Sequence, residues 1–202
     1  MAPPLSAKWI ESPPAVEVRF ALAGAPGAAA LAKLSEDELA RARNFVSEGA
    51  RRRFVAGRVL LRELLGDLLD APPAALRFDL AAGGRPELAE PWRGALEFSV
   101  SHSGDLAAAA ASDRVASIGI DVEAVRPVRR AAAIAERYFG PDEAALIASL
   151  NGPERDAAFL RQWTRFEAAV KATGGALRVA DLRLPPGYVG AVATAARSTA
   201  RG

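Results

Sequence analysis

The chain has 202 residues and half of them are apolar, so it can bury the core of one domain or of two small halves packed together. Lysine and arginine number 26 and aspartate and glutamate 24, a balance that gives no support for general binding to nucleic acid. The absence of cysteine and the presence of a single histidine exclude disulfides, thiolate metal sites, cysteine nucleophiles and multi-histidine metal sites.

The first half of the chain shows the periodicities of both strands and helices. Alternating polar and apolar residues predict a strand over residues 16–20. Ser35 followed by Glu38 is a capping box, which predicts the start of a helix. Apolar side chains at helical spacing predict a second helix over residues 51–69, which a proline pair at residues 72–73 ends. The other elements expected here are strands at residues 76–80, 96–101 and 106–111, a turn at 83–86 and a loop at 101–105.

The second half begins with a longer predicted strand over residues 115–123 and continues mostly as helices. Helices are expected at residues 128–139, 142–150 and 154–173, and the glycine pair 174–175 ends the last of them as a C-cap would. Further strands are expected at residues 188–194 and near 178–182. This mixture of elements indicates an α+β fold with α/β-like features.

Two acids lie close together in the strand expected over residues 115–123. Because side chains alternate across a strand, Asp121 and Glu123 share one face, while Ile120 and Val122 point into a core. Two neighbouring carboxylates repel each other unless a charge neutralises them, and magnesium prefers such oxygen ligands. The pair is equally compatible with a strand that runs out into solvent and carries two surface acids, so both interpretations stay open.

A helical segment, residues 163–171, carries a second pair of charges. Glu167 and Lys171 are four residues apart and therefore share one face of the helix. Taken alone, such a pair is better explained as a surface ion pair worth a few tenths of a kcal/mol.

The Ser-His-Ser-Gly segment at residues 101–104 offers hydroxyls, an imidazole and backbone amides, a combination that suits a phosphate. A lone histidine such as His102 is more often structural or solvated. A serine hydrolase is not supported, because no G-x-S-x-G elbow accompanies the segment.

Arginines are frequent in the helix expected over residues 51–69. Arg51, Arg58 and Arg62 share one helical face and Arg53 lies elsewhere. As a group they are expected to form a solvated basic face, although one or two could hold a phosphate in the bidentate way that arginine allows.

In their order and spacing these motifs resemble the Sfp-type 4′-phosphopantetheinyl transferases. The matching elements are an arginine ahead of a helix (RRFVAGRVLLRELL), G-[KR]-P at residues 84–86, S-H-S at 101–103, G-I-D-x-E at 119–123 and W-x-x-K-E-A-x-x-K at 163–171. The resemblance covers about residues 35–175.

The resemblance implies an enzyme made of two related α/β halves, residues 1–115 and 116–202, with coenzyme A bound in the cleft between them. The implied reaction moves the 4′-phosphopantetheine moiety of coenzyme A to a serine of an acyl or peptidyl carrier protein and releases 3′,5′-ADP. Its implied cofactor is Mg²⁺, with Mn²⁺ as a substitute.

The resemblance also implies a role for each matching residue. Asp121, Glu123 and Glu167 would gather around the metal ion, and Glu167 would deprotonate the carrier serine. Lys171 would bind coenzyme A and assist the departing 3′,5′-ADP. The other residues implied to contact coenzyme A are Arg53, Arg85, Ser101 and His102, with Arg53 and His102 at its phosphates.

One position and one segment depart from the family pattern. Phe166 stands where many members have lysine, so we expect altered contacts without loss of catalysis. The segment after Lys171 is short, which predicts a smaller sheet in the second half.

Other functions have weaker support. A relative that binds coenzyme A or a carrier protein without efficient transfer is the main alternative, although all three acids and the lysine are present. An unrelated magnesium-dependent phosphotransferase would need a G-x-x-x-x-G-K-[ST] loop, which the chain lacks. With no run of about 18 apolar residues and no pattern typical of a secretion signal, we expect a cytoplasmic protein that does not contact a membrane. We also expect a monomer that does not bind nucleic acid.

Overall fold

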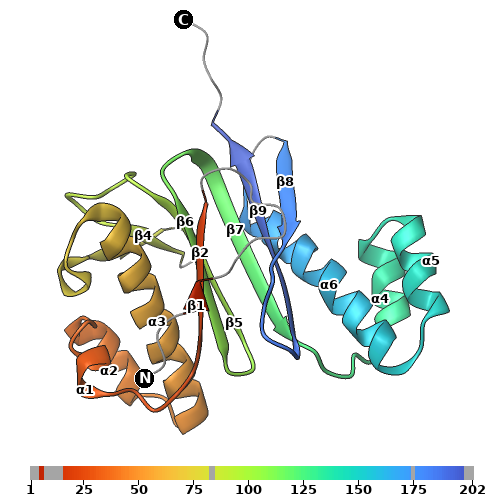
Figure 1. The fold of residues 1–202 in the computed structure, drawn as a ribbon, viewed down its shortest axis with the longest axis horizontal. Coiled ribbons are helices and arrows are strands. Elements are labelled where there is room, and N and C mark those ends of the chain that lie inside the picture. Colours follow the sequence, from red (N-terminus) through yellow and green to blue (C-terminus); the bar gives the residue numbers. More distant parts are fainter. Residues whose placement is uncertain (1–4, 7–15, 82–84, 174–175, 198–202) are drawn as a thin grey trace, which may run out of the picture.

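A computed structural model describes residues 5–6, 16–81, 85–173 and 176–197, and Figure 1 shows the arrangement of the elements. The first two residues of the turn predicted at 83–86, and the predicted C-cap at 174–175, lie outside the described residues. The first half contains β1 (Leu5–Ser6), β2 (Glu17–Leu22), α1 (Ala28–Leu31), α2 (Glu36–Arg43), α3 (Glu48–Leu69), the 3₁₀ turn η1 (Pro73–Ala75), β3 (Phe78–Leu80), β4 (Pro86–Leu88), β5 (Glu97–Ser103) and β6 (Leu106–Ser112). The second half contains β7 (Val115–Ala124), α4 (Ala131–Tyr138), α5 (Pro141–Ser149), α6 (Gly152–Lys171), β8 (Leu177–Asp181) and β9 (Tyr188–Ala196).

The fold is α+β, as the sequence predicts, and it is built around two antiparallel sheets. One sheet has the strand order β1-β2-β6-β5 and the other β7-β9-β8, while β3 and β4 form a separate hairpin. Figure 1 shows α1, α2 and α3 on one side of the sheets and α4, α5 and α6 on the other. The boundary expected between residues 115 and 116 falls at the first residue of β7, and the division into two halves stays a prediction.

Alternation along the central strands explains how the layers pack. In β6, Ala108 and Ala110 lie in a core shared with Ile118, Ile120 and other apolar residues of both sheets. The alternate residues of β6 face α3 in a second core that includes Leu61. On the far side, Ala168 of α6 packs against alanines of β9. The two sheets therefore share one interior, with α3 and α6 covering their outer faces.

The sheets meet along β5 and β7, where serine side chains bridge the two strands. The hydroxyl oxygens of Ser99, Ser101 and Ser103 accept hydrogen bonds from the backbone amides of Ile120, Val122 and Ala124, at 3.2, 3.3 and 3.1 Å. We call these three residues the serine seam. Both partners advance by two residues at each step, so β5 and β7 run in the same direction.

Several predicted elements are confirmed and one is wrong. Ser35 and Glu38 form the predicted capping box of α2. Helix α3 starts at Glu48, a few residues earlier than expected, because Ser47 caps it. The loop expected at residues 101–105 is wrong for its first three residues, which continue β5 as far as Ser103. Serine is common in turns, which favoured a loop, but the hydroxyls of Ser101 and Ser103 accept hydrogen bonds from the backbone of β7.

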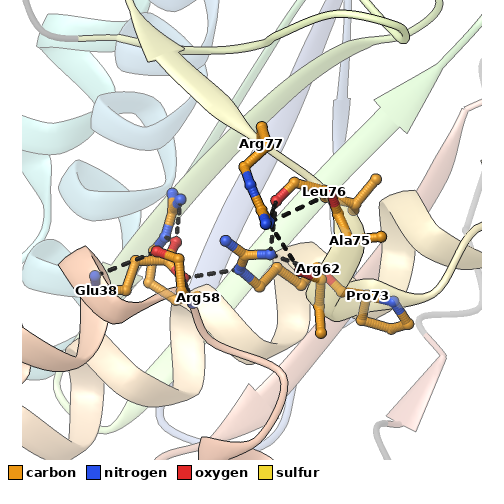
Figure 2. Close-up of polar contacts among 9 residues, drawn as sticks. Glu38, Arg58, Arg62, Pro73, Ala75, Leu76 and Arg77 are labelled. Carbon is orange, nitrogen blue, oxygen red and sulfur yellow. Dashed lines mark hydrogen bonds and ion pairs between the residues drawn. The ribbon is translucent and has the colours of Figure 1, made fainter.

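The prediction that the arginines of α3 form a solvated basic face is also wrong in part. Arg62 is 1% exposed, whereas Arg51 lies near solvent and pairs with Glu48. Figure 2 shows Arg62 between the Glu38 carboxylate, 2.7 Å away, and the carbonyl oxygens of Pro73 and Leu76 at 2.7 and 3.1 Å. Arg58 pairs with the other oxygen of Glu38. Buried charge is tolerated here because each group is paired and hydrogen-bonded.

The remaining elements follow the prediction with small shifts at their ends. Helices α4, α5 and α6 and strands β8 and β9 match the five elements expected after residue 127. The second sheet has three strands among the described residues. Helix α1, the turn η1 and strands β1 and β4 were not predicted. None of the described helices carries an apolar stretch long enough to cross a membrane.

Candidate functional site

The acid pair of β7 lies next to the serine seam. Asp121 is only 7% exposed. The interpretation of the pair as surface acids on a strand that runs out into solvent is therefore wrong for Asp121. Ser101 donates a hydrogen bond to Asp121 Oδ1 at 2.9 Å, and Ser103 donates one to Glu123 Oε2 at 2.6 Å. Ile120 and Val122 are buried in the core, as predicted. The alternation of β7 therefore places two anchored carboxylates on one side of the strand.

Lys171 joins this acid pair to the end of α6. Its ammonium group donates to Asp121 Oδ1 at 2.7 Å and to the Ile120 carbonyl oxygen at 3.1 Å. In the described part of the chain Lys171 makes no ion pair with Glu167. The surface ion pair favoured from spacing alone is therefore wrong, because tertiary packing gives Lys171 a partner on β7.

Gly119 allows α6 to lie directly against β7. A Cβ atom at this position would be 2.7 Å from the Ala172 amide nitrogen and closer still to the Ala168 carbonyl oxygen. Backbone atoms cannot move aside as a flexible side chain can, so no larger residue fits without shifting the helix. The glycine of the G-I-D-x-E motif thereby sets the distance between the acids of β7 and the side chains at the end of α6.

Lys171, which bonds to Asp121, also lines a pocket of about 400 Å³. The pocket lies between α3, β5 and α6, with apolar walls that include Phe54 and Phe98. Five groups that can carry positive charge line it, namely Arg53, Arg58, Arg85, His102 and Lys171. Four of these were predicted from the sequence to contact coenzyme A, and Arg58 was not singled out. A cationic pocket with aromatic walls suits a ligand that combines phosphates with a ring system.

The pocket residues are held by different neighbours. Arg53 lies 3.9 Å from Asp105 and His102 is exposed. Arg85 donates to the Phe98 carbonyl oxygen at 2.9 Å and makes longer contacts of 3.4 Å to the carbonyl oxygens of Ile118 and Lys171. Arg85 thus touches β5, β7 and α6 at once. Ser101, also predicted to contact coenzyme A, uses its hydroxyl on Asp121, and the predicted contact stays a prediction.

Glu167 is partly buried on α6. Among the described residues no group of three or more acids or histidines is close enough to hold a metal ion. Its predicted roles as a metal ligand and as a base therefore stay predictions.

Phe166, the departure from the family pattern, belongs to an aromatic cluster. Its ring lies 5.6 Å from that of Tyr138, 5.7 Å from Trp163 and 6.5 Å from Phe139, measured between centroids. Such pairs add about 0.5–1.5 kcal/mol each beyond the burial of area. The phenylalanine therefore links α6 to α4 through ring contacts.

The donor set at the acid pair fits a hard divalent cation. Carboxylate oxygens are the ligands that Mg²⁺ prefers, together with waters and phosphates. Asp121 Oδ2 and Glu123 Oε1 make no hydrogen bond to any described residue, so each carboxylate keeps one oxygen for such an ion. Waters and the oxygens of a bound phosphate would supply the remaining ligands.

Sequence reasoning missed Ser99 of the serine seam and the contact of Arg126. Ser99 lines up with Ser101 and Ser103 at every second position, a pattern that places all three on one face of a strand. Arg126 lies 3.4 Å from Glu123 Oε2, and no pattern in the sequence indicates that contact.

Comparison with known proteins accounts for most of the chain. A family model described as the 4′-phosphopantetheinyl transferase superfamily matches residues 117–186. A second, described as the N-terminal part of 4′-phosphopantetheinyl transferase, matches residues 27–114. The acid pair and Lys171 lie in the first region, and the arginines of α3 and the serine seam lie in the second.

Three curated relatives illustrate the similarity. The 4′-phosphopantetheinyl transferase HetI of Nostoc sp. is 42% identical over 144 residues, which cover 71% of this chain and 60% of the relative. The 4′-phosphopantetheinyl transferase psf-1 of Bacillus pumilus is 33% identical over 123 residues, covering 61% and 50%. The 4′-phosphopantetheinyl transferase ffp of Bacillus subtilis is 30% identical over 156 residues, covering 71% and 67%.

The chain spans between half and two thirds of the length of these relatives. The matched regions nevertheless include the G-I-D-x-E strand, the serine seam and the helix that carries Lys171. By its two family regions and its relatives, the chain belongs to the 4′-phosphopantetheinyl transferase superfamily.

Proposed function

We propose that this protein transfers the 4′-phosphopantetheine moiety of coenzyme A to a serine of an acyl or peptidyl carrier protein and releases 3′,5′-ADP. The observation that carries the proposal is the position of Lys171. Its ammonium group bonds to Asp121, and its side chain also lines the cationic pocket. One residue thereby links an acid pair suited to a metal ion with a pocket suited to phosphates.

The proposed roles follow from the requirements of phosphoryl transfer, in which positioning and charge neutralisation matter more than covalent chemistry by the protein. Arg53, Arg58 and His102 bind the phosphates of coenzyme A. Lys171 stabilises the departing 3′,5′-ADP. Asp121, Glu123 and Glu167 would hold a Mg²⁺ ion, which would supply Lewis-acid polarisation of the pyrophosphate.

The attacking hydroxyl of the carrier serine loses a proton during transfer. We assign the acceptance of that proton to Glu167, directly or through a water molecule. The Gly119 contact supports this assignment, because it keeps the end of α6 close to the acids of β7.

A groove of about 350 Å³ beside Glu123 is the surface that we propose for the carrier protein. Trp163, Phe159 and Val128 supply apolar contacts, and Arg126 and Arg129 line it with positive charge. A carrier that presents apolar residues and acids around its serine would fit this groove. We further propose that the protein acts as a cytoplasmic monomer.

The direct test is to incubate the chain with coenzyme A, Mg²⁺ and an apo carrier protein, and to measure the mass of the carrier. A gain of one phosphopantetheine group per carrier supports transfer. If the carrier mass stays unchanged while the chain binds coenzyme A, the alternative is favoured, namely a relative that binds without efficient transfer.

Glu167→Gln is expected to lower the rate of transfer by at least about a hundredfold, the lower end of the effect of general base catalysis. The substitution keeps the shape of the side chain and removes its charge and its ability to accept the proton. Carrier modification followed by mass spectrometry measures the rate. Glu154→Gln, at the exposed start of the same helix, is the control, and equal rates for both variants would remove Glu167 from the mechanism.

His102→Ala is expected to weaken the binding of coenzyme A by about 10- to 150-fold, the worth of a charge-assisted hydrogen bond. Dephospho-coenzyme A, which lacks the 3′-phosphate, should bind to both proteins almost equally. Calorimetric titration of both ligands gives a cycle in which a general loss of stability cancels. Equal losses for both ligands would show that His102 does not contact the 3′-phosphate.

A further inference from the structure

The serine seam contains two kinds of serine. All three hydroxyls accept a hydrogen bond from a backbone amide of β7, so all three help to join the sheets. Ser101 and Ser103 also donate their hydroxyl protons to Asp121 and Glu123, whereas Ser99 makes no bond to a carboxylate among the described residues. Joining the sheets requires only that the hydroxyls accept from β7, so the bonds that Ser101 and Ser103 donate to the carboxylates are not needed for that purpose.

Each acid is held through a single oxygen. Asp121 Oδ1 accepts both from Ser101 at 2.9 Å and from Lys171 at 2.7 Å. Glu123 Oε2 accepts from Ser103 at 2.6 Å and lies 3.4 Å from Arg126. These contacts hold one oxygen of each carboxylate and leave the other without a hydrogen bond to any described residue.

Fixed orientation matters because two like charges on one side of a strand repel each other. Without the hydroxyl donors, each side chain could turn away from its neighbour, and binding a cation would then require both to be reordered. Hydrogen bonds to ligating carboxylates commonly set metal affinity for this reason, and losing one costs about 10- to 100-fold in affinity or activity.

We propose that Ser101 and Ser103 are positioning residues, which orient Asp121 and Glu123 so that one oxygen of each is presented to a divalent cation. This inference rests on the proposed function. It gives the S-H-S motif a role toward the metal ion in addition to any contact with coenzyme A. Ser99 has the same place in the seam but no such role.

The test measures the uptake of Mn²⁺ by the full chain at saturating coenzyme A, with free Mn²⁺ followed by electron paramagnetic resonance. Ser101→Ala and Ser103→Ala are each expected to weaken Mn²⁺ binding by about 10- to 100-fold. Ser99→Ala, the matched control, should bind Mn²⁺ like the wild type. Ser103→Thr keeps the hydroxyl and should stay close to wild type as well.

Thermal unfolding separates positioning from stability. Each alanine variant leaves one amide of β7 without its acceptor, so all three should lower the melting temperature to a similar degree. If metal affinity falls equally in all three, or in none, the positioning role is wrong. Ser103→Cys gives the same comparison if an alanine variant fails to fold, because a thiol is a weaker donor of similar shape.

The outcomes also distinguish this inference from the proposed function. A wild-type protein that takes up no Mn²⁺ with coenzyme A and modifies no carrier would contradict both. A wild type that binds Mn²⁺ and modifies the carrier, with Ser101→Ala and Ser103→Ala indistinguishable from Ser99→Ala in Mn²⁺ affinity, would overturn the positioning role alone.

Discussion

Asp121→Asn is expected to lower the rate of carrier modification by about a thousandfold while the protein stays folded. Loss of several kcal/mol of charge stabilisation in the transition state corresponds to this factor, since each 1.36 kcal/mol is about tenfold in rate. The asparagine keeps the shape and can still accept from Ser101, but it removes the charge that a cation needs. The contact with Lys171 weakens as well, so binding and departure of the nucleotide suffer together.

The measurement is the initial rate of mass gain of the carrier at saturating Mg²⁺ and coenzyme A. Circular dichroism checks the fold of the variant. Asp142→Asn, on the exposed first turn of α5, provides a matched change of charge and should be neutral. Turnover by Asp121→Asn at the wild-type rate would exclude this residue from the metal site.

Glu38→Gln is expected to reduce the free energy of unfolding by about 3–5 kcal/mol, the cost of leaving a buried charge without its partner. Arg62 would keep its bonds to the carbonyl oxygens of Pro73 and Leu76 but would lose its counter-charge (Figure 2). Arg58 pairs with the same carboxylate, so one substitution removes the partner of two arginines. Urea denaturation measures the change.

Lowering the pH should reproduce part of the loss of stability expected for Glu38→Gln. Burial alone raises the pKa of Glu38, but Arg58, the Ser35 amide and Arg62 outweigh it and hold the pKa below its ordinary value of 4.5. A carboxyl whose pKa is lowered by folding contributes stability that is present above its unfolded pKa. The contribution is lost as the pH falls through the lower, folded value.

Wild-type stability should therefore fall on acidification more steeply than that of Glu38→Gln. Glu36→Gln, at an exposed position on the same helix, should follow the wild-type curve. Parallel curves for the wild type and Glu38→Gln below pH 4.5 would show that this carboxyl is not held in its charged form by its neighbours.

Local signals predicted much of the fold because they act within a few residues. The capping box of Ser35 and Glu38 needs only one helical turn to form, and it is present. The alternation of Ile120, Asp121 and Val122 is a property of one strand and is likewise confirmed. The end of β5 was missed because the serines there use partners on β7, about 21 residues away in the chain.

Helical spacing did not predict the partner of Lys171. The spacing of Glu167 and Lys171 favoured an ion pair between them, yet Lys171 reaches Asp121, 50 residues away. Helical periodicity also failed for Arg62, which it placed on a face expected to be exposed. Its burial depends on the carbonyl oxygens of the turn after α3, which helical periodicity does not describe.

Gly119 has a consequence for attempts to stabilise this protein. Replacing glycine inside a regular element by alanine commonly gains stability, because the unfolded chain loses conformational freedom. At Gly119 the added methyl group would meet the backbone of Ala168 and Ala172, so the same substitution should separate helix from strand. Engineered variants should therefore keep this glycine. In an uncharacterised homologue, a larger residue here would indicate a helix set further from the acids.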